Sequence, residues 1–447
     1  MTAPRRSLGL LPWVFPAMLL VGALDVLAGG RDLAEHFAQL QAAAPAPRPP
    51  LAAWAQRVVS LLLLLAAIEQ VANHFALRVP ARSRGLLAAF IGYWLATIAA
   101  PAVFGAHPQV GHELLYAPAA GIATCLASPA EKDRLLRLSR DTLLALMAAG
   151  LLLAPLRPVL VMDLSYADGL LPGVPRFAGL ASHPVTQGLL ALVALLLLWA
   201  CPPARRRVRQ AAWALALGVL VIAQSKTAWV AFLVCSLAMA GVRLGGMFWR
   251  RLSDPRRQGF GVAVCAALAT LAAATALWVL SGEAGARLED LLESEQGAQL
   301  VSLTGRDRIW AAAAQEWRAH PVFGYGLSLW DPAYRAGIGL PNATHAHNQF
   351  MDDAARAGSV GALALVAYGL VLAVLSVRRA RATQGLSLAL FLAIALRSVS
   401  EVPLLLRSTD TELFTHLLLL ATLAAAGPGA RARAARAPLS LRPGVAA

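Results

Sequence analysis

The sequence predicts an all-α, polytopic integral membrane protein with about twelve transmembrane helices and one large, partly helical loop outside the membrane. Of its 447 residues, 58% are hydrophobic and only 14% are charged, and the mean hydropathy is +0.61. A water-soluble chain of this length needs more charge to cover its surface. Because lipid offers no water to backbone groups and two-residue alternation is absent, the recurring apolar runs are expected to be helices.

The predicted spans follow one another along the whole chain, each near the length needed to cross a hydrocarbon core of about 30 Å. The first run contains Asp25 and lacks a small-residue cleavage site, so it is expected to be a retained helix. The four cysteines fall in or at the ends of spans and indicate helix packing. The spans are expected near residues 9–29, 54–77, 85–105, 113–128, 141–162, 186–201, 210–224, 228–243, 259–281, 359–377, 385–405 and 412–427.

Lys and Arg gather in one alternating set of connections, which includes "APRRS", "EKDRLLRLSR", "ARRRVR" and "WRRLSDPRR". The positive-inside rule therefore predicts that both termini are cytoplasmic. The formal net charge of +15 then reflects topology and attraction to anionic membrane lipids. Nucleic-acid binding is not expected, because the basic residues are scattered over several short loops.

One connection is much longer than the others, and it divides the chain into predicted regions. We expect nine spans in residues 1–281, a large outward loop at 282–357, three spans at 358–427 and a basic cytoplasmic tail at 428–447. Within the loop, "TGRDRIWAAAAQEWRAH" predicts a helix with Thr304 as its N-cap. "THAHNQFMDDAARAG" predicts a second short helix that begins at Thr344 and ends before Gly358. A loop this long and ordered indicates a functional lid.

The second of these segments carries a recognisable spacing. His347 and Asn348 are followed by nine residues, Gly358, two residues and Gly361. This arrangement resembles the O-antigen ligase family, whose members have twelve spans, cytoplasmic termini and one large periplasmic loop before the tenth span. "TGRDRIW" and "SKTAW" also resemble family segments, although Lys226 stands where the family usually has Arg. The resemblance covers roughly residues 175–361 well, and the first five spans by topology only.

The resemblance implies an enzyme of the bacterial inner membrane with a periplasmic site. Such an enzyme is an inverting glycosyltransferase that moves O-antigen glycan from undecaprenyl diphosphate to a sugar hydroxyl of lipid A–core. The donor already carries a leaving group, so the chemistry needs a base near the acceptor and fixed positive charge around the diphosphate. The expected base is His347, the expected diphosphate-stabilising residues are Arg306 and Lys226, and the further substrate-binding candidates are Arg176, Arg308 and Asn348.

Neither a metal nor another cofactor is expected. If the segment is helical from Thr344, His347 feels the positive end of the helix dipole, which favours neutral imidazole. His345 then lies on the opposite face, about 200° away, and the two histidines cannot share a metal. A strand at this place would reverse that geometry. Asp352 and Asp353 are interpreted as solvated.

Other functions remain open from the residues alone. An O-antigen polymerase or a protein-glycosylating oligosaccharyltransferase would share the donor but use another acceptor. A lipid-linked glycan transporter would need a polar path through the bundle, and ionisable residues do occur inside predicted spans. Arg397 and Glu401, four residues apart, are expected simply to pair. The remaining ionisable residues inside spans are Asp25, Glu69, His74 and His416.

Overall fold

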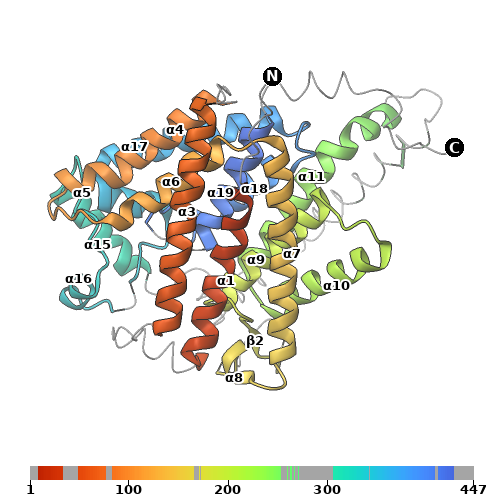
Figure 1. Ribbon diagram of the computed structural model, residues 1–447, viewed down its shortest axis with the longest axis horizontal. Helices are drawn as coiled ribbons and strands as arrows, with labels where there is room; N and C mark the ends of the chain where they lie inside the picture. Colours follow the sequence, from red (N-terminus) through yellow and green to blue (C-terminus); the bar gives the residue numbers. More distant parts are fainter. Residues whose placement is uncertain are drawn as a thin grey trace.

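The computed structural model is built from helices over the residues that it describes (Figure 1). These residues are 9–33, 49–76, 83–165, 171, 173–252, 306–341, 343–407 and 411–426, with a few isolated positions between 259 and 270. Most of the predicted ninth span, the outer loop up to residue 305 with Thr304, and the basic tail lie outside the described residues. Predictions about those segments therefore stay predictions.

The first part of the chain forms a series of helices joined by short connections. The π-helical turn Leu95–Ala99 joins α4 to α5, so these form one continuous stretch. The helices are α1 (Leu11–Gly29), α3 (Pro50–Ala76), α4 (Arg84–Trp94), α5 (Ala100–Phe104), the 3-10 turn His112–Leu115, α6 (Tyr116–Cys125), α7 (Pro129–Leu153) and α8 (Pro158–Val161). The strands β1 (Met162–Asp163) and β2 (Arg176–Phe177) pair in antiparallel register.

The second part of the chain supplies the centre of the bundle and the outer layer. Its helices are α9 (Pro184–Ala200), α10 (Arg206–Ile222), α11 (Lys226–Leu252), α15 (Arg306–Ala319), α16 (Pro332–Gly337), α17 (Gln349–Arg379), α18 (Leu386–Arg397) and α19 (Thr411–Ala425). Helices α9 and α19 are apolar on all sides and buried nearly throughout. A helix of this kind belongs in the core of a bundle.

The predicted class, a membrane protein made of helices, is confirmed in its main feature. Five helical stretches are long and apolar enough to cross a membrane: α1, α3, the stretch Arg84–Phe104, α11 as far as Phe248, and α17. Helices α9, α18 and α19 are apolar but shorter. This search covers the described residues only, so the number of twelve spans and their outward or inward direction remain predictions.

Helix α17 is broken at Gly358, where the predicted loop meets the predicted tenth span. Gly358 has φ 64° and ψ −162°, so the helical ladder is interrupted there. The freed amide groups are satisfied from outside the helix: Ser359 N donates to Pro321 O at 2.8 Å and Val360 N to Val322 O at 3.2 Å. A Cβ atom at Gly358 would lie 2.3 Å from Val322 O. Only glycine fits this close approach of two backbones.

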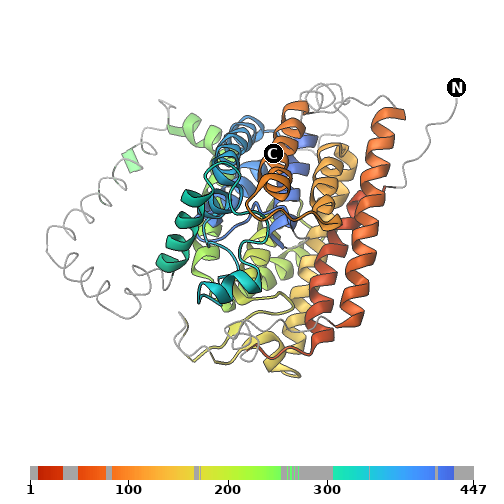
Figure 2. The same cartoon turned by 90° about the vertical axis from the view of Figure 1, so that its left-hand side faces the viewer.

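A small second core covers the start of α17 and carries the outer layer. Helices α15 and α16 and the segments around them pack through a cluster of buried residues separate from the main core: Ile309, Ala313, Leu329, Trp330, Ala343, Ala346 and Ala355. Figure 2 shows α15 on one side of the molecule, with α1 and α3 on the other. The described part of the outer loop is therefore folded, as expected.

One predicted pair inside the spans is wrong. Helix α18 ends at Arg397, so Glu401 does not share a helix with it. Arg397 instead donates from Nε to Glu412 Oε1 at 2.6 Å, while Glu401 turns to a different partner. Glu69 caps α1, because its two carboxylate oxygens accept Gly9 N and Leu10 N at 2.8 and 2.9 Å. These ionisable groups hold the bundle together.

Candidate active site

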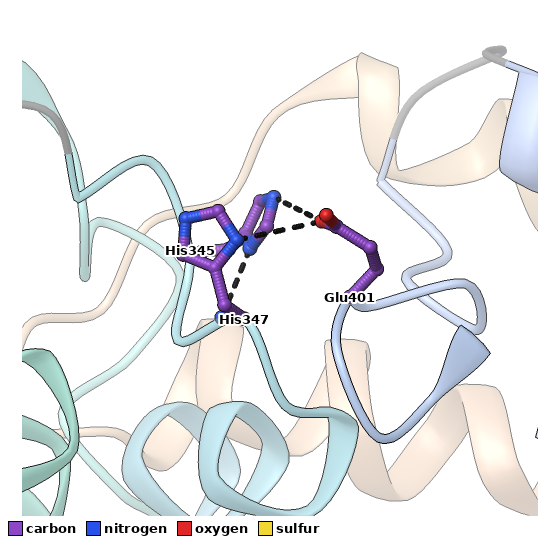
Figure 3. A group of neighbouring side chains, drawn as sticks. All are labelled: His345, His347 and Glu401. Atoms are coloured by element: carbon purple, nitrogen blue, oxygen red, sulfur yellow. Dashed lines mark hydrogen bonds and ion pairs between the residues drawn. The ribbon is translucent and has the colours of Figure 1, made fainter. Parts of the chain in front are cut away.

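His345, His347 and Glu401 converge on one point at the start of α17 (Figure 3). His345 Nε2 lies 3.3 Å and His347 Nδ1 3.5 Å from the same oxygen, Glu401 Oε2. The expectation that the two histidines lie on opposite helical faces is wrong. Helix α17 begins only at Gln349, so both histidines lie in the loop before it, with ring centroids 4.2 Å apart.

The reason lies in the choice of N-cap. Asn348, not Thr344, caps the helix, and its Oδ1 accepts Met351 N at 3.1 Å. Asn is a strong N-cap because its short side chain reaches the free amide groups of the first turn. His347, just outside the cap, takes φ 49°. Positive φ is uncommon for a non-glycine residue and gathers at functional sites. Asn348, expected to bind substrate, therefore has a structural bond on its side-chain oxygen.

Hydrogen bonding fixes the proton of His345. His345 Nδ1 accepts the backbone N–H of His347 at 3.1 Å. A neutral imidazole that accepts at Nδ1 carries its proton on Nε2, and Nε2 is the atom that faces Glu401. Burial first, and the charge of His347 second, lower the pKa of His345 to about 3. His345 is therefore a neutral donor that holds the carboxylate in place.

Glu401 lies in the connection after α18. Gln349, at the start of α17, bonds to this connection on both sides of Glu401. Gln349 N donates to Ser398 O at 2.9 Å, and Gln349 Oε1 accepts Leu404 N at 2.8 Å. Burial alone would raise the pKa of Glu401. The hydrogen-bonding interaction with His347 and the electrostatic attraction to His345, His347 and Arg397 outweigh it and lower the pKa to about 2. Glu401 is therefore a carboxylate anion at any working pH.

His347 is left with one ring nitrogen for chemistry. Its Nδ1 is buried, and Glu401 is its polar neighbour at 3.5 Å, longer than a strong hydrogen bond. A carboxylate beside Nδ1 favours the tautomer with the proton on that nitrogen, which leaves a lone pair on Nε2. This is the arrangement of an oriented general base.

The two aspartates that follow are buried, so their interpretation as solvated side chains is wrong. Asp352 Oδ1 accepts Trp330 Nε1 at 3.0 Å and Ala346 N at 2.9 Å, and its other oxygen pairs with Arg356. The bond to Ala346 N fixes the backbone between the two histidines. Asp352 therefore positions the site. Asp353 makes a different set of contacts.

Asp353 joins the start of α17 to α4. Its Oδ2 accepts the Tyr93 hydroxyl at 2.9 Å and Gln349 Nε2 at 3.0 Å. Charges and amides in a buried network stabilise one geometry when each is satisfied. Both carboxylates are thus engaged with the protein. The helical spacing does not predict the burial of these aspartates, because it does not distinguish a buried face from a solvated one at the start of a helix.

The predicted cation Arg306 begins α15, which is tied directly to the site. Trp310, in the first turns of α15, donates from Nε1 to Ala346 O at 2.8 Å. Ala346 lies between the two histidines, so the N-terminal end of α15 lies beside them. Arg306 is half-buried there, and Arg308 is exposed. A positive charge at a helix N-terminus is destabilised by the helix dipole, so an anionic partner would stabilise Arg306 there.

The other predicted cations come from two connections that are fastened together. Lys226 is exposed at the start of α11. Gln224, two residues earlier, donates from Nε2 to Val174 O at 2.7 Å and accepts Leu171 N at 3.1 Å. These bonds hold the Lys226 hairpin against the segment that leads into Arg176 on β2. The connections that carry Lys226 and Arg176 are therefore neighbours in the fold.

His183 lies in the connection from β2 to α9. It caps α9, since its Nδ1 accepts Val185 N at 3.1 Å. Burial and, next, the positive charge of Arg176 lower the pKa of His183 to about 4, against the opposing charge of Glu401. Arg176 and Glu401 therefore both act on His183 from nearby. His183 was not among the residues predicted from the sequence, and Glu401 was expected only to pair with Arg397.

His345, His347 and Glu401 form the group that, within the described residues, can hold a metal ion, with ligand atoms all within 4.8 Å of one another. The hydrogen bonds argue against this use. A metal-bound histidine usually donates from its other ring nitrogen, whereas His345 Nδ1 accepts a hydrogen bond. Its Nε2 then carries the proton and has no lone pair for a metal. The residues fit a hydrogen-bonded triad better than a metal site.

The chain was compared with known proteins. Residues 211–366 match the family model described as O-antigen ligase. We refer to these residues as the O-antigen ligase region because they are similar to that family. The match confirms the resemblance, and the O-antigen ligase region contains Lys226, Arg306, His347, Gly358 and Gly361. Arg176 and Glu401 lie outside it and are brought to it by the fold. No curated protein matches the chain.

Proposed function

We propose that the protein transfers a glycan from undecaprenyl diphosphate to a sugar hydroxyl of lipid A–core, on the periplasmic face of the bacterial inner membrane. The family of residues 211–366 supports a ligase or polymerase activity on lipid-linked glycans. The observation that carries the proposal further is the pairing of His347 with Glu401, together with the bond from Trp310 to Ala346 O that ties the start of α15, which carries Arg306, to the segment between the histidines. A base and fixed positive charge are what glycosyl transfer from a diphosphate requires.

In the proposed reaction, His347 is the general base. Its Nε2 removes the proton from the acceptor hydroxyl as that oxygen attacks the anomeric carbon of the donor. The bond from this carbon to the diphosphate oxygen breaks, and its electron pair leaves with the diphosphate. Attack opposite the leaving group inverts the anomeric centre. Glu401 stabilises the imidazolium that forms and holds the ring in the productive tautomer, as a carboxylate does for a catalytic histidine.

The diphosphate is assigned to Arg306 and Lys226, with Arg176 and Arg308 as further contacts. A leaving diphosphate gains negative charge as its bond breaks, so nearby cations stabilise the transition state more than the bound donor. Lys226 supplies a point charge where Arg would supply a planar fork. Lys226 therefore keeps the positive charge but cannot form the two parallel hydrogen bonds that Arg makes to a phosphate.

A reconstituted reaction tests this function. The purified protein is incubated with lipid-linked O-antigen and lipid A–core, without nucleotide, in buffer with or without EDTA. We expect glycan on lipid A–core in both buffers. Extended glycan on the undecaprenyl carrier would instead indicate a polymerase. Loss of activity in EDTA that Mg²⁺ or Zn²⁺ restores would contradict the metal-independent mechanism and make the triad a metal site.

A further inference from the structure

A cavity of about 610 Å³ lies inside the helix bundle, apart from the histidines. Its walls come mainly from α1 and α3, with smaller contributions from the 3-10 turn His112–Leu115, α6, α7, the connection before α9, α9 itself, the connection before α19 and α19. The volume is within the range of about 300–1,000 Å³ typical of ligand sites. None of these walls belongs to α11 or α15, which carry the proposed diphosphate cations.

The cavity changes character along its length. Aliphatic side chains line the part of the cavity that lies near the middle of α1 and of α3, among them Leu19 and Leu64. Charged groups line the part near the start of α3 and the start of α19, which we call the mouth; they include Arg57 on α3 and Arg407 before α19. Water is a poor occupant of an apolar cavity. A hydrocarbon chain with a polar head at the mouth matches this order.

The mouth adjoins the candidate site at two separate places. Arg407 lies in the same connection as Glu401 and donates to Leu327 O of the outer layer. Ser182 also lines the cavity and directly precedes His183, whose pKa responds to the charge of Glu401. Arg31 binds this second place by donating to Ala181 O at 2.7 Å and Ser182 O at 2.9 Å. A lipid head at the mouth would therefore lie beside the triad.

We propose that this cavity binds one acyl chain of the lipid A–core acceptor, with the phosphorylated sugar head at Arg57 and Arg407. The inference rests on the proposed function, which assigns the donor diphosphate to Lys226 and Arg306, on two helices that line no part of the cavity. Donor and acceptor then occupy separate parts of the protein, built from different helices. Asp25 and Glu113 also line the mouth. Carboxylates accept hydrogen bonds from sugar hydroxyls, so a mouth with both charges suits a phosphorylated sugar.

A glycine in the wall allows a direct test. Gly22 lines the cavity, and a Cβ atom added there meets nothing within 4 Å. The variant Gly22→Phe fills the cavity without a clash at the backbone. Gly218→Phe on α10 is the matched control, since Gly218 is exposed and equally open. Binding of labelled lipid A–core to the full-length protein is measured without donor, and binding of lipid-linked O-antigen without acceptor.

We expect Gly22→Phe to weaken lipid A–core binding by about tenfold or more, with donor binding unchanged and the control equal to wild type. Core oligosaccharide without acyl chains should bind both proteins equally. Unchanged lipid A–core binding, or weaker donor binding instead, overturns the inference. If Gly22→Phe does not fold, the same binding measurements are made on Leu61→Trp, whose side chain lines the cavity from the exposed face of α3. It should also weaken lipid A–core binding. The binding measurements need no turnover. Loss of ligation therefore tests the proposed function, and lipid A–core binding tests this inference independently.

Discussion

His347 Nδ1 and Glu401 Oε2 lie 3.5 Å apart, although His347 precedes α17 and Glu401 follows α18 in the chain. The contact exists because Gln349 fastens the connection after α18 to the start of α17 through its backbone and its side chain. A histidine held by a buried anion has one nitrogen fixed and one free, so this relationship determines what His347 can do.

Glu401→Gln should lower the turnover number and change the pH dependence of the rate. The pKa of Glu401 is about 2, so wild-type Glu401 stays charged from neutral pH well into acid. Removing that charge makes the neighbouring imidazole a weaker base. The rising limb of the rate profile should therefore move to lower pH, and Glu401→Asp should retain part of the rate. Glu316→Gln, at a carboxylate bonded to Tyr334, is the control. A reduced rate with an unmoved profile would mean that Glu401 is only structural.

Removing either proposed diphosphate cation should slow ligation. A charge-assisted bond contributes about 1.5–3 kcal/mol, so Lys226→Ala and Arg306→Ala should each lower the rate about tenfold or more. Lys226→Arg should keep substantial activity, because the charge is retained. Arg318→Ala, an exposed cation at the far end of α15, should behave as wild type. Normal donor binding and turnover in both Ala variants would reject the assignment.

Gly358→Ala should destabilise the protein. The added Cβ atom would lie 2.3 Å from Val322 O, at a residue with φ 64°. Strain of this kind costs about 1–3 kcal/mol. Gly369→Ala on the same helix is the control, since a Cβ atom there meets nothing within 4 Å. Thermal unfolding of the two variants in the same detergent compares them. Equal midpoints would show that the break in α17 tolerates a side chain.

Topology can be tested by labelling from outside intact spheroplasts, in a background in which the native cysteines are replaced by Ala. A Cys at Gly337, exposed in α16, should react with a membrane-impermeant reagent. A Cys at Arg206, exposed at the start of α10, should not. The reverse pattern would place the triad in the cytoplasm, away from a periplasmic acceptor.

The helical membrane class and the glycine spacing were predictable from the sequence because each depends on local features. Apolar runs reveal spans wherever they occur, and Gly358 ends a short helix as expected. The triad was not predictable, because Glu401 reaches His347 only through the packing of a distant connection. The helix start was misplaced because Thr344 and Asn348 are both acceptable caps, and the Asp352 bond to Ala346 N favours the later one.

The most direct test of the account is ligation by His347→Ala, measured beside His345→Ala with the same lipid-linked donor and lipid A–core. A positioned base contributes about 10²–10⁴ in rate, so His347→Ala should lose at least that lower factor while it still folds and binds the donor. His345→Ala should lose less, because His345 holds Glu401 and the backbone of His347 but carries its own proton on Nε2. Near-normal turnover by His347→Ala would contradict the general-base mechanism, and equal, severe losses in both variants would indicate a shared metal or a purely structural pair.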